Sequence, residues 1–139
     1  MKAAVYVGVG NAGTDVRLEA LLAELRSAGW EVKVLSGGAD ELADCDFLLS
    51  VGGDGTFLAA SALSVSSGVP IVGVNLGRVG FLSENKPQDV ARSLLSGDYE
   101  IEERTVLRAS IEGSVSDEAE KFWPYAFNEF TVHRNGAAM

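Results

Sequence analysis

Short apolar, β-prone segments alternate with helical segments from the start of the chain to residue 97, and this alternation constrains the fold most. Each apolar segment is followed by glycine or polar residues, which is typical of buried strands that end in loops. These segments are residues 3–9, 30–35, 47–51 and 70–74. Helices are expected at 18–25, where leucines recur at helical spacing, at 56–67 and at 87–95.

The alternation of strands and helices predicts an α/β fold, in which a parallel sheet carries helices on both faces. Thr14 or Asp15 is expected to cap the first helix, and Gly29 stands where its C-terminal cap belongs. Ligands of such folds bind beyond the carboxyl ends of the strands. The loop at 52–56 follows one of these strands, so it is the first place to look for a site.

The pattern changes after Gly97. Residues 99–112 alternate in part and have no helical stripe, and residues 122–134 are again apolar and β-prone. These two segments predict long antiparallel strands, which would leave exposed edges. We therefore expect an α/β domain at 1–98, followed at 99–139 by the first strands of a β-rich second domain that is incomplete in this chain.

The composition narrows the range of partners. The chain has 139 residues, of which 47% are hydrophobic and 22% charged, and this is typical of a globular protein. Its net charge of -9 argues against a nucleic-acid surface, although glycine amides and helix N-termini can still hold phosphate. Cys45 stands alone, so no intrachain disulfide or cysteine-based metal site is expected. No segment has the features of a signal peptide or transmembrane span, so a cytoplasmic protein without a membrane partner is expected.

Gly8, Gly10 and Gly13 spell G-x-G-x-x-G between a strand and a helix, the fingerprint of dinucleotide-binding folds. That fingerprint requires an acidic residue near the end of the next strand, where it holds a ribose hydroxyl. Ser36-Gly37-Gly38 occupies that place, and Asp40 lies beyond the strand. A plain strand-to-helix turn therefore explains these glycines better than a dehydrogenase site does.

The loop Gly52-Gly53-Asp54-Gly55-Thr56 places one carboxylate among three glycines. The glycines let backbone amides approach phosphate oxygens, and the following helix offers its N-terminus to the same anion. Asp54 could accept a proton from a hydroxyl that attacks a phosphoryl group, or help to hold a divalent metal ion. It could equally cap a helix that begins at Gly55 or Thr56. The residues alone leave these alternatives open.

Three motifs together resemble one family. The pentapeptide at 52–56 is similar to the GGDGT signature shared by NAD kinases, diacylglycerol-type lipid kinases and, in variant form, phosphofructokinases. Residues 73–82, GVNLGRVGFL, resemble the G-x-N-x-G-x-x-G-F-L segment of NAD kinases, which lipid kinases lack. Asn128-Glu129 resembles that family's N-[ED] motif at the start of a strand. The chain is thus similar, along its whole length, to the N-terminal part of bacterial NAD kinases.

The resemblance implies a Rossmann-like or phosphofructokinase-like sheet and a transfer of phosphate from ATP, or polyphosphate, to the 2′-hydroxyl of the adenosine ribose of NAD. It implies Asp54 as the catalytic base, with Mg²⁺ or another divalent cation on the donor phosphates. NAD would contact Asp54, Gly55, Phe81, Asn128 and Glu129. The donor phosphates would contact Gly52, Gly53, Thr56, Asn75 and Arg78. No metal ligand is assigned.

Two other functions share parts of this pattern. A lipid kinase would use the same phosphate loop, but the 75–81 loop and Asn128-Glu129 argue against it. An inactive nucleotide-binding fragment is the other alternative, because the family's β-rich domain contributes further binding residues. By analogy with the family, the complete protein is expected to form a dimer or tetramer.

Overall fold

The computed structural model describes residues 1–8, 15–35, 42–77, 80–110, 112 and 123–131. It divides into two compact units, residues 1–101 and residues 102–139. The helices and strands of the first unit are β1 (Lys2–Val7), α1 (Val16–Ser27), β2 (Glu31–Val34), β3 (Phe47–Val51), α2 (Asp54–Ser67), β4 (Ile71–Val74) and α3 (Pro87–Ser96). The second unit has β5 (Leu107–Arg108) and β6 (Tyr125–Ala126).

The first unit is built on a four-stranded sheet in the order β2-β1-β3-β4. All neighbouring strands are parallel, with Ala4 opposite both Lys33 and Leu48 in the register. The chain passes from β1 to β2 in one direction and then returns to the other side of β1 with β3. Such a reversal opens a crevice at the carboxyl ends of the two central strands, where α/β proteins bind ligands.

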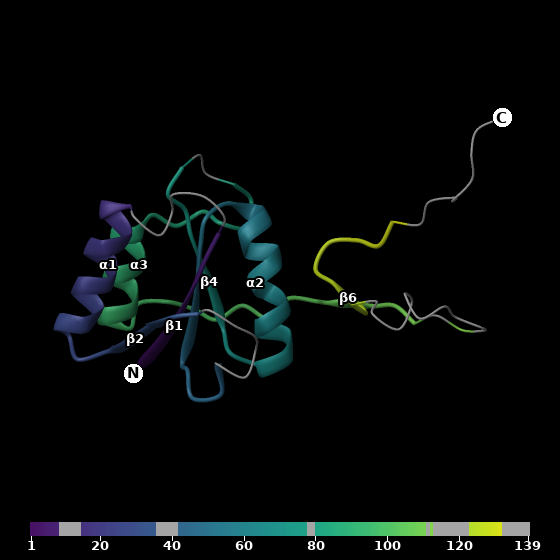
Figure 1. Ribbon diagram of the computed structural model, residues 1–139, viewed down its shortest axis with the longest axis horizontal. Helices are drawn as coiled ribbons and strands as arrows, with labels where there is room; N and C mark the ends of the chain where they lie inside the picture. The colour runs from purple at the N-terminus through teal and green to yellow at the C-terminus, as the bar shows by residue number, and fades with distance from the viewer. Residues whose placement is uncertain (9–14, 36–41, 78–79, 111, 113–122, 132–139) are drawn as a thin grey trace. The chain divides into compact units, whose positions relative to one another are not determined.

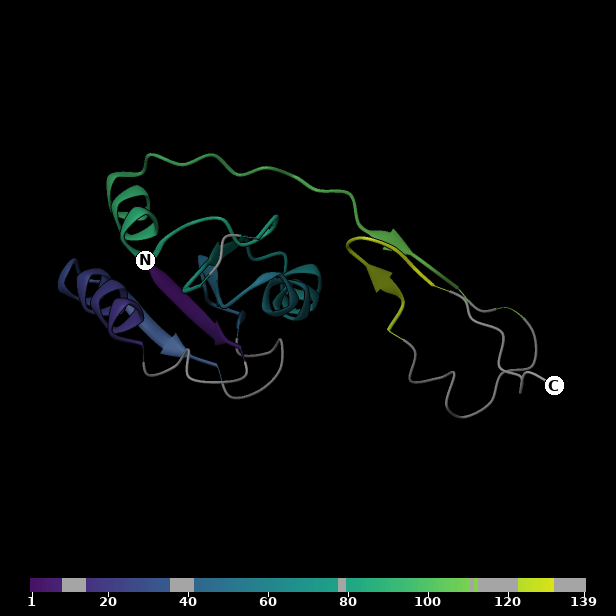
Figure 2. The ribbon, with the colours of Figure 1, turned by 90° about the horizontal axis from the view of Figure 1, so that it is seen from above.

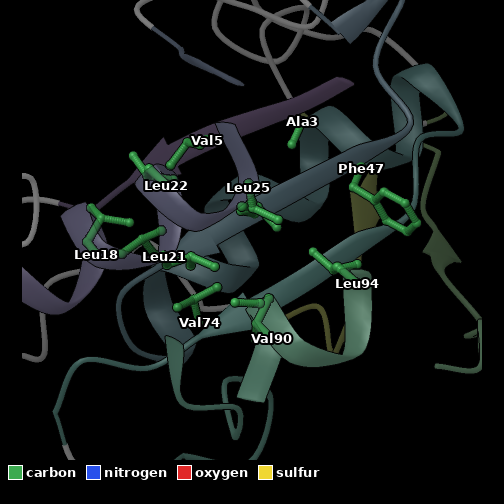
Figure 3. Packing of buried hydrophobic residues seen from close by; sticks show 13 residues of the cluster. Ala3, Val5, Leu18, Leu21, Leu22, Leu25, Phe47, Val74, Val90 and Leu94 are labelled. Atoms are coloured by element: carbon green, nitrogen blue, oxygen red, sulfur yellow. The ribbon is translucent and has the colours of Figure 1, made fainter. Parts of the chain in front are cut away.

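Helices cover both faces of the sheet, as the sequence predicts. Figure 1 shows α1 and α3 side by side on one face and α2 on the other, and the view from above in Figure 2 agrees. Buried residues form one cluster on each face. The leucines of α1 pack with Val5, Val74 and Leu94 in the first cluster, which Figure 3 shows from close by. The prediction of a parallel α/β sheet is therefore confirmed.

The central strands β1 and β3 are mostly apolar on both sides because both faces of the sheet are covered. All five residues of β3 are buried, and it lies between β1 and β4 at the centre of the sheet. Ser50 is the polar member of this strand, and its hydroxyl has no hydrogen-bond partner among the described residues. Cys45 is half-buried and packs against the cluster on the α2 face.

The helix ends follow the local sequence signals. The side chain of Asp15 accepts a hydrogen bond from the backbone N–H of Arg17 and caps α1, as predicted. Pro87 begins α3, and α2 and α3 end at Gly68 and Gly97, which have φ angles of 75° and 71°. Glycine suits these two ends because a left-handed residue terminates a helix without a Cβ penalty.

Two predictions about helices and strands are wrong: the start of the second helix, and the length of the last two strands. The second helix begins at Asp54 and not at Thr56, so Asp54 belongs to the helix itself. Long strands at 99–112 and 122–134 are also not found, because within the described part of those segments only 107–108 and 125–126 pair, in antiparallel fashion. No described residue of the second unit is buried, and strands without a packed face form only short ladders.

Candidate functional site

The candidate site lies in the loop that joins β3 to α2, at the carboxyl edge of the central strands. The backbone N–H of Gly52 donates to the carbonyl of Val74 (2.9 Å), and the N–H of Gly8 donates to Val51 (3.0 Å). Gly52 has φ +152°, and a Cβ there would come within 2.8 Å of the Thr56 Cβ. The loop is therefore tied to the strands on both sides, and Thr56 fills the space that glycine leaves.

The N-terminus of α2 carries no side-chain cap. Its N-cap residue is Gly53, which has an extended backbone and no side chain to accept from the first-turn amides. A Cβ at Gly53 or Gly55 would meet nothing within 4 Å, so the surface here is open to a close approach. Uncapped amides and the positive end of the helix dipole favour an anion at this position. The predicted phosphate residues Gly52, Gly53 and Thr56 are thus brought together at a suitable place.

The carboxylate of Asp54 does not cap its own helix. Its Oδ2 accepts from the backbone N–H of Phe81 (3.0 Å), and its Oδ1 accepts from the N–H groups of Leu82 (3.0 Å) and Ser83 (3.1 Å). These bonds lower the pKa of Asp54. The bond from Phe81 has the largest effect, and the bond from Leu82 the next largest. The carboxylate is held in its ionised form and joined to the loop that follows β4.

That second loop is held by buried polar side chains. Asn75, directly after β4, is 5% exposed, and its Nδ2 donates to the carbonyl of Ser83 (2.8 Å). The Oδ1 of Asn75 accepts from the N–H of Gly77 (2.6 Å). Ser83 is fully buried, and its hydroxyl donates to the carbonyl of Gly52 (2.9 Å). Ser83 therefore links the two glycine loops directly.

Sequence reasoning missed Ser83 and the role of Gly80. A Cβ at Gly80 would lie within 2.6 Å of the Asp54 Cγ, so only glycine lets the two loops approach this closely. The next residue, Phe81, presents a side chain that is 92% exposed. The glycine at 80 belongs to the motif that drew attention to the loop, but nothing in the sequence pairs it with Asp54.

The other predicted residues lie in the second unit or outside the described residues. Asn128 and Glu129 lie in the second unit, where both are exposed. Arg78 lies outside the described residues, as do Gly10 and Gly13 of the first glycine motif. The structure therefore brings together Gly52, Gly53, Asp54, Gly55 and Thr56 with Asn75 and Phe81 of the second loop.

In the part of the chain that the structure describes, no resident metal site is found. Within the described ranges, no group of three or more His, Cys, Asp or Glu side chains could hold a metal ion. Three N–H donors use three of the about four acceptor positions of the Asp54 carboxylate, so at most one remains for another ligand. A cation carried on nucleotide phosphates needs few protein ligands, so this arrangement is compatible with one. In the same described ranges, no helix is long and apolar enough to cross a membrane.

Comparison with known proteins identifies relatives. A family model described as the ATP-NAD kinase N-terminal domain matches residues 10–97. An NAD kinase from Thermobifida fusca (strain YX) is 35% identical over 138 residues, which cover 94% of this chain and 42% of the relative. An NAD kinase 2 from Streptomyces coelicolor is 38% identical over 138 residues, covering 96% of this chain and 44% of the relative.

A solved structure shows the same similarity. The crystal structure of an NAD kinase from Archaeoglobus fulgidus in complex with ATP has a TM-score of 0.50 and 33% sequence identity to this chain. The match covers 68% of this chain and 35% of the archaeal one. The chain thus spans less than half the length of the relatives that it matches.

Proposed function

The chain belongs to the ATP-NAD kinase family, and on that premise we propose that its complete protein converts NAD to NADP. The 2′-oxygen of the adenosine ribose forms a bond to the γ-phosphorus of ATP, the bond from that phosphorus to the ADP oxygen breaks, and the hydroxyl loses its proton. The observation that carries this proposal is the uncapped N-terminus of α2 beside the ionised carboxylate of Asp54. One feature suits phosphates and the other suits a hydroxyl.

The phosphate side of the proposed site is made of backbone. The amides at 53–56, at the start of the helix, would hold phosphoryl oxygens without any positive side chain, and Gly52, whose amide donates to Val74, would let the phosphate come close. Asn75 and Arg78 are further proposed phosphate-side residues, and the bonds of Asn75 hold the backbone at Gly77 and Ser83. Mg²⁺ bound to the donor phosphates would offset their charge, as in other phosphoryl transfers.

Asp54 is proposed to receive the ribose hydroxyl. An ionised carboxylate has about four acceptor positions, and Oδ2 uses one of its two on Phe81, so one remains for the hydroxyl. The lowered pKa makes Asp54 a weak base before the reaction. Its main action would therefore be to orient the hydroxyl, and it would take the proton only as the new bond to phosphorus forms.

Four further residues are proposed to contact NAD. The exposed ring of Phe81 would flank the adenine, and Gly55 would leave room for the nucleotide beside Asp54. Asn128 and Glu129 would hold ribose hydroxyls, since an amide and a carboxylate together can donate and accept. We also propose that the complete protein is a cytoplasmic homo-oligomer that binds neither nucleic acid nor membrane.

The test is NADP formation by the product of the complete reading frame. NAD is incubated with ATP and Mg²⁺, and NADP is measured by an enzyme cycle specific for NADP. Polyphosphate in place of ATP, and NADH in place of NAD, establish the preferred donor and acceptor. We expect NADP with at least one donor. A folded protein that binds ATP and forms no NADP or NADPH with any of these pairs would contradict the proposed function.

A further inference from the structure

We propose that Asp54 is also a positioning residue, which fastens residues 80–83 to the start of α2 and thereby fixes the place of the Phe81 ring. This inference rests on the proposed function in one respect, the contact between Phe81 and the adenine of NAD. It adds a second role to a residue that would otherwise act only on the ribose hydroxyl. We call Asp54 together with the backbone N–H groups of residues 81–83 the loop clasp.

The loop clasp consists of three consecutive amides that converge on one carboxylate. The three N···O distances are 3.0, 3.0 and 3.1 Å. Successive N–H groups that point to one side form a concave anion site, which in many proteins holds a phosphate. Here a side chain 27 to 29 residues away in sequence fills it. Hydrogen bonds to an ionised acceptor are about twice as strong as neutral ones, so the clasp holds the backbone firmly.

The Phe81 ring depends on this clasp for its position. The residue is 92% exposed, so its side chain has little packing to hold it in place. Its location is set by its own backbone, and the N–H of that backbone donates to Oδ2 of Asp54. An exposed aromatic ring binds a base well only if it is already in place, because ordering it on binding weakens the affinity.

The two ends of the loop are held differently. At Ser83, the hydroxyl donates to Gly52 and the carbonyl accepts from Asn75, in addition to the bond from its N–H to Asp54. The amides of Phe81 and Leu82 are held by Asp54. Loss of the carboxylate should therefore release the Phe81 end while Ser83 stays attached. The expected result is a local change at the ring rather than unfolding of the domain.

Two substitutions disturb the clasp in different ways. In Asp54→Asn, the amide oxygen can still accept from Leu82 and Ser83, but its NH₂ group then faces the N–H of Phe81, and two donors cannot bond. In Gly80→Ala, the carboxylate remains, but the new methyl would lie within 2.6 Å of its Cγ and push it away. Both changes should free Phe81, although only the first removes the charge.

The effect of the clasp on NAD affinity can be measured without the phosphoryl-transfer reaction. If Asp54 served only the ribose hydroxyl, Asp54→Asn would weaken NAD binding by the same factor with or without the Phe81 ring. If it also positions Phe81, part of that loss disappears when the ring is removed. A loop that holds the ring in place only a tenth of the time raises the apparent Kd about tenfold.

The experiment is a double-mutant cycle on NAD affinity, measured by calorimetry without ATP on the product of the complete reading frame. The variants are Asp54→Asn, Phe81→Ala and the double variant, with Gly80→Ala as a second disturbance of the clasp. Asp89→Asn is the matched control, since it removes an exposed Asp from the first turn of α3. We expect about a tenfold rise in Kd for Asp54→Asn and for Gly80→Ala, and none for Asp89→Asn.

The NAD affinity of the double variant shows whether Asp54 and Phe81 act together or independently. Because Asp54 acts in part through Phe81, the double variant should bind about tenfold more tightly than independent losses would predict, a clear departure from additivity. Additive losses, or an unchanged Kd in Asp54→Asn and Gly80→Ala, would overturn the inference while the proposed function stands. A folded wild-type protein that does not bind NAD would overturn both.

Discussion

Two aspartates stand at the start of two helices in this molecule and do opposite things. Asp15 caps α1: its Oδ1 accepts from the N–H of Arg17 at 2.8 Å, and its Oδ2 pairs with the Arg17 guanidinium at 2.7 Å. Asp54 begins α2 and leaves the cap position to Gly53. Its carboxylate instead bonds to the loop at 81–83.

The difference shows what a helix start can be used for. At α1 the acid accepts from a first-turn amide, so a carboxylate already occupies the position that an anion would take. At α2 the acid serves a distant loop, and the amides of the helix start stay free of any side-chain cap. A site for phosphate and a site for a hydroxyl can therefore lie side by side at α2, and not at α1.

The largest expected difference between the two aspartates is in the rate of NADP formation. We expect Asp54→Asn to lower the rate of NADP formation at least about 100-fold, because it removes both the hydroxyl acceptor and the clasp on Phe81. Asp15→Asn keeps a good capping residue and should change the rate by less than about twofold. Initial rates at saturating ATP, on proteins with matched circular dichroism spectra, give the comparison. Equal losses of rate in the two variants would contradict the proposed difference between the two aspartates.

A smaller effect is expected from Gly80→Ala. The added methyl meets the Asp54 carboxylate, so the KM for NAD should rise about tenfold while the acceptor itself is retained. The KM for ATP should change little, because the amides at the start of α2 are not affected. Steady-state kinetics, with NAD and ATP varied in turn, give the two KM values separately. An unchanged KM for NAD would mean that the loop tolerates a Cβ at this position.

Acid should reduce the contribution of both aspartates to the stability of the fold. The pKa of each is lowered in the folded state, that of Asp15 to about 2, chiefly by the hydrogen bond from the Arg17 side chain. Groups with depressed folded-state pKa values stabilise the fold above the unfolded value near 3.8. That stability is lost as the pH falls from the unfolded value through the folded value, because over this range the unfolded state binds more protons than the folded state does.

Thermal midpoints between pH 6 and pH 2 test this expectation. The difference between wild type and Asp15→Asn, and that between wild type and Asp54→Asn, should be constant at neutral pH and shrink below about pH 4. Differences that stay constant down to pH 2 would show that neither carboxylate is stabilised in its ionised form.

The smallest effect is expected from Ser83→Ala. Its buried hydroxyl donates to Gly52, and loss of one such bond costs about 1 kcal/mol, a few degrees in the thermal midpoint. Ser66→Ala is the matched control, because its exposed hydroxyl only donates back to Ala62 within α2. Differential scanning calorimetry measures both. A control that loses as much stability as Ser83→Ala would argue against a specific link between the loops.

Much of the fold was predictable from the sequence, because it follows local rules. The third strand, 47–51, matches its predicted bounds, and the leucine stripe at 18–25 gives α1. The cap at Asp15 was also predictable, since its partner lies two residues away. The predicted length of the strands at 99–112 and 122–134 was wrong, because an alternating sequence does not by itself supply a face for the strands to pack against.

The candidate site was predictable in its location and not in its contacts. Glycines after a buried strand pointed to 52–56, and a family motif pointed to 73–82. The partner of Asp54 is set by the approach of two loops across the sheet edge, which no local pattern encodes. Ser83 follows the motif by one residue, and an ordinary serine gives no signal that it will be fully buried.

Hydrogen exchange of the backbone amides at 81–83 tests the central claim most directly. The measurement compares the wild-type protein with Asp54→Asn and with Asp89→Asn near neutral pH, without any ligand. The clasp predicts protected amides in the wild type and in Asp89→Asn, and at least about tenfold faster exchange at Phe81 in Asp54→Asn. Equal exchange at Phe81 in all three proteins would contradict the claim that the Asp54 carboxylate holds this loop.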